Sequence, residues 1–191
     1  MSSATTVENL RVAVIVGSVR NGRFGGHIGA WVHKRLAEAD IDTDVIDLAD
    51  LTFPHTMGEH PDVASFAARI GRADAVVVVT PEYNHSYPGP LKTAIDTLRD
   101  EWRAKPVAFV SYGGMAGGLR AVEALRLVFA ELHAVTVRDT VSLHNPWGPA
   151  ADPAVGYPDS AAGEALHSMM RQLRWWADAL RTARNEEPYP S

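Results

Sequence analysis

A continuous apolar segment near the middle of the chain constrains the fold most strongly. Residues 75–80 read AVVVVT, with four consecutive valines and no alternation of polar and apolar side chains. A strand of this kind has both faces covered, which is the usual situation inside a parallel sheet. The sequence on either side alternates short β-branched runs with longer segments of helical period, and this alternation is typical of βαβ units.

Five strands of this type can be placed along the chain. We expect them at residues 11–16, 43–48, 75–80, 107–111 and 135–141. A helix is expected after each strand, so the 191 residues fit an α/β flavodoxin-like three-layer sandwich with a five-stranded parallel sheet of order 2-1-3-4-5. We therefore predict one domain over residues 10–184, with flexible ends at 1–9 and 185–191.

The composition argues against several classes of function. Eighteen Lys and Arg residues against 23 Asp and Glu residues give a net charge of −5, and the basic residues are not gathered in one stretch, so no nucleic-acid partner is expected. The chain contains no cysteine, which excludes disulfides, thiolate nucleophiles and iron–sulfur clusters. His55, His60 and His144 do not have metal-ligand spacing, so no metal site is predicted.

The same features bear on location. The longest apolar run, residues 75–79, is far shorter than the roughly 18 to 20 residues of a membrane span. The first nine residues are polar and lack the apolar core of a signal peptide. Together with the absence of cysteine, this predicts a soluble, cytoplasmic protein with no membrane partner.

The loop after the first strand carries anion-binding chemistry. Residues 17–26 read GSVRNGRFGG and place Ser18, Arg20 and Arg23 just before a helix. Backbone amides at a helix N-terminus favour a phosphate, and arginine meets phosphate oxygens two at a time. The loop matches neither the dinucleotide GxGxxG pattern nor a Walker A loop. The alternative is a set of turn glycines with solvated arginines.

Two further loops follow the third and fourth strands. Residues 81–92, PEYNHSYPGPLK, combine a rigid proline turn with backbone amides and an aromatic ring, Tyr83, that could pack against a flat heterocycle. Residues 111–118, SYGGMAGG, remove side chains where a strand meets a helix, so the backbone can approach a ligand closely. The alternative for this glycine-rich segment is a connection that only accommodates helix packing.

These three motifs, in this order and after these strands, resemble the NAD(P)H-dependent FMN reductase family. The resemblance covers most of the chain and implies a flavodoxin-like FMN-binding reductase domain, with non-covalent FMN, in a family that includes flavin, quinone, azo-dye and chromate reductases. It implies that FMN is bound by Ser18, Arg20, Arg23, Phe24, Gly25, Pro81, Glu82, Tyr83, Asn84, Ser111, Tyr112, Gly113, Gly114 and Gly117. Many relatives have serine and asparagine where this chain has Arg23 and Gly25.

The resemblance also implies a reaction and an assembly. NADPH or NADH would reduce the bound FMN, and a small oxidant would then reoxidise it, with the chain acting as a homodimer or homotetramer. Such a reaction needs positioned binding groups rather than an acid or base, so no catalytic residue is nominated. The amides of Gly113 and Gly114 are expected to stabilise negative charge on the reduced flavin. Residues 144–158 are expected to form a loop over the substrate face.

Two alternatives to this function stay open from the sequence. One is a flavodoxin-like electron carrier that exchanges electrons with protein partners and does not turn over a nicotinamide. The other is a ligand-free interaction module built on the same fold. Arg20 and Arg23 favour the reductase over the carrier, because flavodoxins usually have a phosphate loop rich in threonine and serine.

Overall fold

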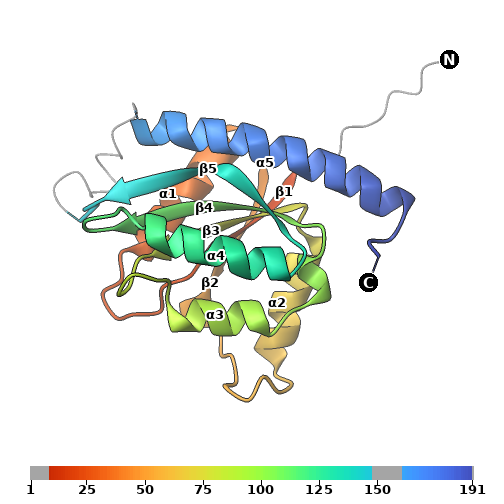
Figure 1. Ribbon diagram of the computed structural model, residues 1–191, viewed down its shortest axis with the longest axis horizontal. Coiled ribbons are helices and arrows are strands. Elements are labelled where there is room, and N and C mark those ends of the chain that lie inside the picture. The colour runs from red at the N-terminus through yellow and green to blue at the C-terminus, as the bar shows by residue number, and fades with distance from the viewer. Residues whose placement is uncertain (1–8, 148–160, 191) are drawn as a thin grey trace.

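Five parallel strands form the central sheet of the protein, whose computed structural model describes residues 9–147 and 161–190 (Figure 1). The strand order is β2-β1-β3-β4-β5, which confirms the predicted flavodoxin-like order. The strands are β1 (Arg11–Val16), β2 (Asp42–Asp47), β3 (Ala75–Pro81), β4 (Pro106–Gly113) and β5 (Val135–His144). All seven residues of β3 are buried, as their continuous apolar character predicts.

Helices cover both faces of the sheet. One face is covered by α1 (Gly25–Glu38) and α5 (Ala161–Glu186). The other is covered by α2 (Pro61–Arg72), α3 (Gly89–Asp96) and α4 (Leu119–Glu131). Short 3-10 turns, η1 (Leu48–Asp50) and η2 (Asp100–Trp102), follow β2 and α3. Figure 1 shows α5 lying along one face of the sheet while α3 and α4 lie on the opposite face.

Alternate residues of each strand point to opposite faces, so the protein has two hydrophobic cores. Val12 and Val14 of β1 pack in the core beneath α1 and α5, whereas Ala13 and Ile15 pack beneath α2, α3 and α4. Trp102 anchors the second core with its ring fully buried, and its indole Nε1 donates a hydrogen bond to the carbonyl of residue 95 at 3.0 Å. The sheet is therefore held rigidly from both sides.

Three strands run further than the sequence predicts: β3 by one residue, to Pro81, and β4 and β5 by two or more. β4 ends at Gly113 and β5 ends at His144, because the pairs Tyr112↔Leu143 and Gly113↔His144 continue the parallel ladder. Tyr112 and Gly113, which lie beyond the predicted strand 107–111, are therefore the last residues of a strand. Such a position restricts their backbone far more than a loop does.

The structure describes the C-terminal end of the predicted domain up to residue 190 but describes the chain only from residue 9 at the N-terminal end. Helix α5 continues to Glu186, two residues into the segment expected to be flexible. Beyond it, the Tyr189 hydroxyl lies 3.1 Å from His133 Nδ1. Residues 1–8 lie outside the described residues, so the expected flexibility of both ends stays a prediction. None of the helices in the described parts of the chain combines the length and apolar character needed to cross a membrane.

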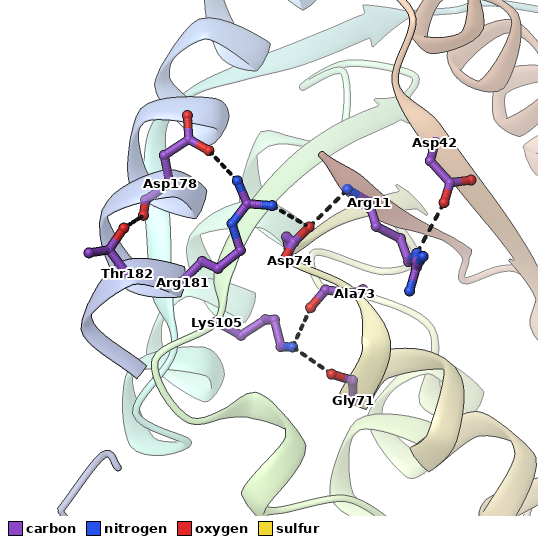
Figure 2. A network of polar contacts seen from close by, with 9 residues as sticks. All are labelled: Arg11, Asp42, Gly71, Ala73, Asp74, Lys105, Asp178, Arg181 and Thr182. Carbon is purple, nitrogen blue, oxygen red and sulfur yellow. Dashed lines mark hydrogen bonds and ion pairs between the residues drawn. The ribbon is translucent and has the colours of Figure 1, made fainter. Parts of the chain in front are cut away.

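A polar network ties together the amino ends of the strands, at the edge of the sheet opposite the three loops (Figure 2). The Asp74 carboxylate, just before β3, accepts hydrogen bonds from the Arg11 backbone amide at 3.0 Å and from Arg181 of α5 at 3.3 Å. Lys105, just before β4, donates from Nζ to the carbonyl of Ala73 at 2.5 Å. This network connects α2, α5 and two strands at the edge remote from the candidate site.

Candidate functional site

The three loops singled out from the sequence converge on one cavity. They follow β1, β3 and β4, which are neighbours in the sheet, so the loops lie side by side at its carboxyl edge. The cavity has a volume of about 460 Å³. Larger hollows, of about 660 and 600 Å³, lie away from these loops, beside α2 and beside β5. The cavity is lined by Arg20, Asn21, Gly22, Arg23, Phe24, Pro81, Glu82, Tyr83, Tyr112, Gly113 and Trp147.

Most of the predicted site residues line this cavity. Eight of the fourteen do so: Arg20, Arg23, Phe24, Pro81, Glu82, Tyr83, Tyr112 and Gly113. The other six are not among the lining residues: Ser18, Gly25, Asn84, Ser111, Gly114 and Gly117. The structure adds three lining residues that sequence reasoning did not assign: Asn21, Gly22 and Trp147.

Trp147 is the lining residue contributed from outside the three motifs. It follows β5 and is 53% exposed. The backbone amide of Asn145 donates to the carbonyl of Gly113 at 2.8 Å, and Asn145 has a positive φ of 45°, so the chain turns immediately after the strand. The signal available in the sequence was the loop expected over the substrate face at residues 144–158, of which 148–158 lie outside the described residues.

The first loop leads directly into α1, which begins at Gly25. The amides at the start of a helix have no partner within the helix, so they face the loop as hydrogen-bond donors. Gly25 is required here because a Cβ would lie 2.8 Å from the Tyr112 hydroxyl oxygen and 3.2 Å from a methyl of Val16. Gly25 thus allows close packing between α1 and the sheet.

Ser18 joins the first loop to the second. Its side chain is fully buried, and its hydroxyl oxygen lies 2.7 Å from the hydroxyl oxygen of Tyr83. This hydrogen bond holds the Tyr83 ring at the cavity wall. The two motifs, 65 residues apart in sequence, are therefore fixed relative to each other.

The two arginines of the first loop differ in their surroundings. Arg20 is exposed, whereas the Arg23 side chain is 26% exposed and its Nη2 donates to the Asp47 carboxylate at 2.5 Å. Asp47 is the last residue of β2, and the sequence motifs did not point to it. Arg23 is therefore a fixed cation and Arg20 a solvated one.

The second loop turns sharply after Glu82. The backbones of Tyr83 and Ser86 exchange hydrogen bonds at 2.9 and 3.0 Å, and the two residues between them, Asn84 and His85, have φ values of 48° and 73°. This is the geometry of a two-residue hairpin of type I′, in which asparagine is favoured. Asn84 shapes the turn, while Tyr83 faces the cavity.

Glu82 has a structural partner. Its Oε1 accepts from Arg120 Nη1 at 2.9 Å, and its Oε2 accepts from the Arg120 backbone amide at 3.3 Å, in the first turn of α4. A carboxylate at a helix N-terminus is stabilised by the helix dipole. Glu82 therefore orients the second loop against the first turn of α4.

The third loop depends on two glycines with left-handed backbones. Gly117 and Gly118 have φ values of 57° and 89°, and a Cβ on Gly118 would lie 2.6 Å from the Cβ of Ser111 and 2.7 Å from the Tyr112 nitrogen. The buried Ser111 hydroxyl donates to the Gly117 carbonyl at 2.9 Å. Ser111 and Gly117 therefore shape the loop from behind, and Gly118, absent from the predicted site residues, is equally necessary.

With this geometry described, the chain can be compared with known proteins. Residues 10–148 match the NADPH-dependent FMN reductase family. The protein belongs to this family. The match spans all three loops and all five strands, so the membership rests on the whole sheet and on the cavity at its edge.

Several relatives carry names of the same kind. An NAD(P)H-dependent FMN reductase of Schizosaccharomyces pombe is 37% identical over an alignment of 122 residues that covers 56% of this chain and 60% of that protein. A quinone reductase of Escherichia coli K12 is 36% identical over an alignment of 141 residues that covers 68% of this chain and 74% of the relative. The aligned part thus spans between three-fifths and three-quarters of these two relatives.

Solved structures agree on the fold. A flavoenzyme NAD(P)H:(acceptor) oxidoreductase from Paracoccus denitrificans superposes with a TM-score of 0.73 at 25% identity, covering 88% of this chain and 98% of that one. An archaeal flavodoxin superposes with a TM-score of 0.55 at 13% identity, covering 90% of this chain and 99% of the flavodoxin. At that identity the likeness shows the flavodoxin-like fold alone.

The cavity residues fit FMN. Arg23 Nε is a buried donor that has no hydrogen-bond partner among the described residues, and it lies in the loop expected to hold the phosphate. Gly113 lets the second and third loops pack closely at the cavity wall, because a Cβ there would lie 3.1 Å from the Gly118 nitrogen and 3.3 Å from the Cβ of Glu82. The half-buried ring of Tyr83, which lines the cavity, adds flat apolar surface of the kind that an isoalloxazine ring needs.

Proposed function

We propose that this protein binds FMN in the cavity between the three loops and uses NAD(P)H to reduce quinones or other small oxidants. The observation that carries the proposal is the convergence of three separate motifs on one cavity at the carboxyl edge of the sheet. Family membership supports the same reaction class. The preference between NADPH and NADH is left to experiment.

The residues act by binding and orientation. Bound FMN supplies the redox chemistry, by accepting a hydride from NAD(P)H and passing two electrons to an oxidant. Arg23 and the first amides of α1 would hold its phosphate, because both present donors to an anion. The backbone at Gly113 would approach the ring, and Tyr83, fixed through Ser18, would pack against it.

Trp147 lies where an oxidant would enter the cavity. Trp147 lines the cavity and is half exposed, so one part of its ring faces the space where an oxidant would enter. A flat aromatic oxidant gains stacking energy on such a ring. This supports quinones as a substrate class over small inorganic oxidants.

Assembly as a homodimer or homotetramer is part of the proposal. The apolar stripe of α3 faces its own sheet, because Leu91 and Ile95 are fully buried. Helix α4 instead keeps Leu119 and Leu127 exposed, at 43% and 76%, near Met115 at 89%. These exposed apolar side chains support self-association through α4. A mass of 20.7 kDa in light scattering, that of one chain, would contradict it.

A spectrum tests the cofactor and the reaction together. Purified protein is mixed with FMN, desalted, and titrated under argon with NADPH and then NADH. Retained absorbance near ~450 nm that bleaches with either nucleotide is the expected result. Retained flavin that neither nucleotide bleaches would favour an electron carrier, and no retained flavin would contradict the proposed site.

A matched pair of variants locates the flavin. Gly113→Val forces a side chain against the Gly118 backbone and Glu82 at the cavity wall, and is expected to abolish FMN retention. Gly163→Val makes the same change in α5, where an added Cβ meets nothing within 4 Å, and is expected to retain FMN. Equal retention by both variants would place the flavin elsewhere.

A further inference from the structure

The Arg23–Asp47 pair is anchored on both sides of the carboxylate. Asp47 Oδ2 accepts from Arg23 Nη2 at 2.5 Å, and Asp47 Oδ1 accepts from the backbone amide of Ala49 at 3.0 Å. Both side chains are largely withdrawn from solvent, with exposures of 26% for Arg23 and 20% for Asp47. Because both oxygens of the carboxylate are engaged, Asp47 has one orientation, and it imposes one on the guanidinium.

The sheet topology brings these two residues together. Asp47 ends β2 and lies in register with Val16, which ends β1. Parallel neighbouring strands end at the same edge, so the carboxylate of Asp47 lies beside the loop that starts at Gly17. Asp47 therefore reaches the phosphate loop although it belongs to a different strand.

The Arg23 guanidinium has N–H donors that Asp47 does not use. It carries five N–H groups in a rigid fork, and the structure assigns one of them to Asp47. The Nε group is buried and has no partner within residues 9–147 and 161–190. A buried donor without an acceptor is costly, and Arg23 lines the cavity, so an anionic oxygen bound there would satisfy it.

We propose that Asp47 is a positioning residue, which holds Arg23 so that its Nε–H meets the phosphate of FMN. This inference rests on the proposed function. Because Asp47 already holds the Arg23 side chain in one orientation, less conformational entropy is lost when the phosphate binds. Arg20 is exposed and serves as a general positive charge instead. The negative charge of Asp47 repels the phosphate. Asp47 therefore favours FMN binding through the orientation of Arg23 and not through its own charge.

Comparison of FMN with riboflavin isolates the phosphate. Riboflavin lacks the phosphate but carries the same ring, so both are titrated into flavin-free protein by quenching of flavin fluorescence. Asp47→Asn is expected to weaken FMN binding about tenfold and to leave riboflavin binding unchanged. Arg23→Lys, which keeps the charge and loses the Nε donor, is expected to weaken FMN binding by about the same factor.

Control variants make the outcome decisive. Asp50→Asn, in the same 3-10 turn and exposed, is expected to leave both affinities unchanged. Once Arg23→Ala is present, Asp47→Asn is expected to have no further effect on FMN affinity, because the two residues act as one unit.

The opposite results are equally clear. Unchanged or tighter FMN binding by Asp47→Asn would overturn the inference, since removal of a nearby negative charge would then dominate. An equal loss for FMN and riboflavin would overturn it too, because the role of Asp47 would be structural. Failure of the unmodified protein to bind FMN would overturn the proposed function and this inference together, whereas the first two results leave that function intact.

Discussion

Because of Lys105, the free energy of unfolding of the protein is expected to increase with pH in the alkaline range. Its side chain reaches into the polar network at the amino edge of the sheet, and the residue is only 4% exposed (Figure 2). Nζ donates to the carbonyls of Ala73 at 2.5 Å and Gly71 at 3.4 Å, at the C-terminal end of α2. These carbonyls carry the negative end of the helix dipole, so a cation is well placed but poorly hydrated.

Burial lowers the pKa of Lys105 from 10.5 to about 8, because the charged form loses its water. The positive charge of Arg184 lowers that pKa further, while Asp74 and Glu101 oppose the change. Between pH 8 and 10.5 the unfolded chain therefore binds more protons than the folded protein, and stability rises with pH across this window. The difference between the two pKa values corresponds to about 3 kcal/mol.

Urea unfolding of the unmodified protein and of Lys105→Met, from pH 7 to 10.5, measures this effect. Other titrations cancel in the difference between the two proteins, so the unmodified protein should gain about 3 kcal/mol relative to the variant. Lys34→Met, at an exposed lysine of α1, should show a constant difference. A constant difference for Lys105→Met as well would refute the reasoning. Lys105→Gln retains a donor and serves if the methionine variant does not fold.

Three other changes test the loops and the sheet edge. Gly118→Ala forces a side chain into a left-handed turn with a close contact, and should cost ~2 kcal/mol in thermal unfolding, whereas Gly163→Ala should be neutral or stabilising. Arg126 donates to the carbonyls of residues 137 and 138 on β5, so Arg126→Ala should lower the free energy of unfolding in urea by about 1 to 3 kcal/mol. The side chain of Arg138 is 94% exposed, so Arg138→Ala should lower it by less than about 0.5 kcal/mol. Trp147→Ala should raise the KM for a quinone about fivefold without changing FMN affinity, and an unchanged KM would remove Trp147 from substrate binding.

Local patterns were sufficient for the architecture. The run at 75–80 identifies a doubly covered strand, and the βα alternation leads to the sheet order, because parallel strands and right-handed crossovers leave few arrangements open. The three motifs also point to one edge of the sheet, where they line one cavity, since each follows a strand and ligands in such folds bind beyond the carboxyl ends.

Residue roles within those motifs were less predictable. Ser18, Asn84 and Ser111 are residue types that bind ligands in loops, and the structure adds a role within the protein for each: Ser18 contacts Tyr83, Asn84 forms a turn, and Ser111 contacts Gly117. The same hydroxyl or amide chemistry serves either purpose, and sequence does not say which partner is nearer. Burial decides this, and burial depends on packing between distant segments.

The sequence by itself determined the strand order, the edge of the sheet where the candidate site lies, and the polypeptide segments that line its cavity, because these follow from hydrophobic period and glycine placement. Only the tertiary structure decided that Asp47 holds Arg23, that Trp147 reaches the cavity, and that Lys105 is buried with a lowered pKa. Each of these depends on contacts between residues far apart in the chain. Such contacts are created by strand register and by side-chain packing, which local sequence patterns do not specify.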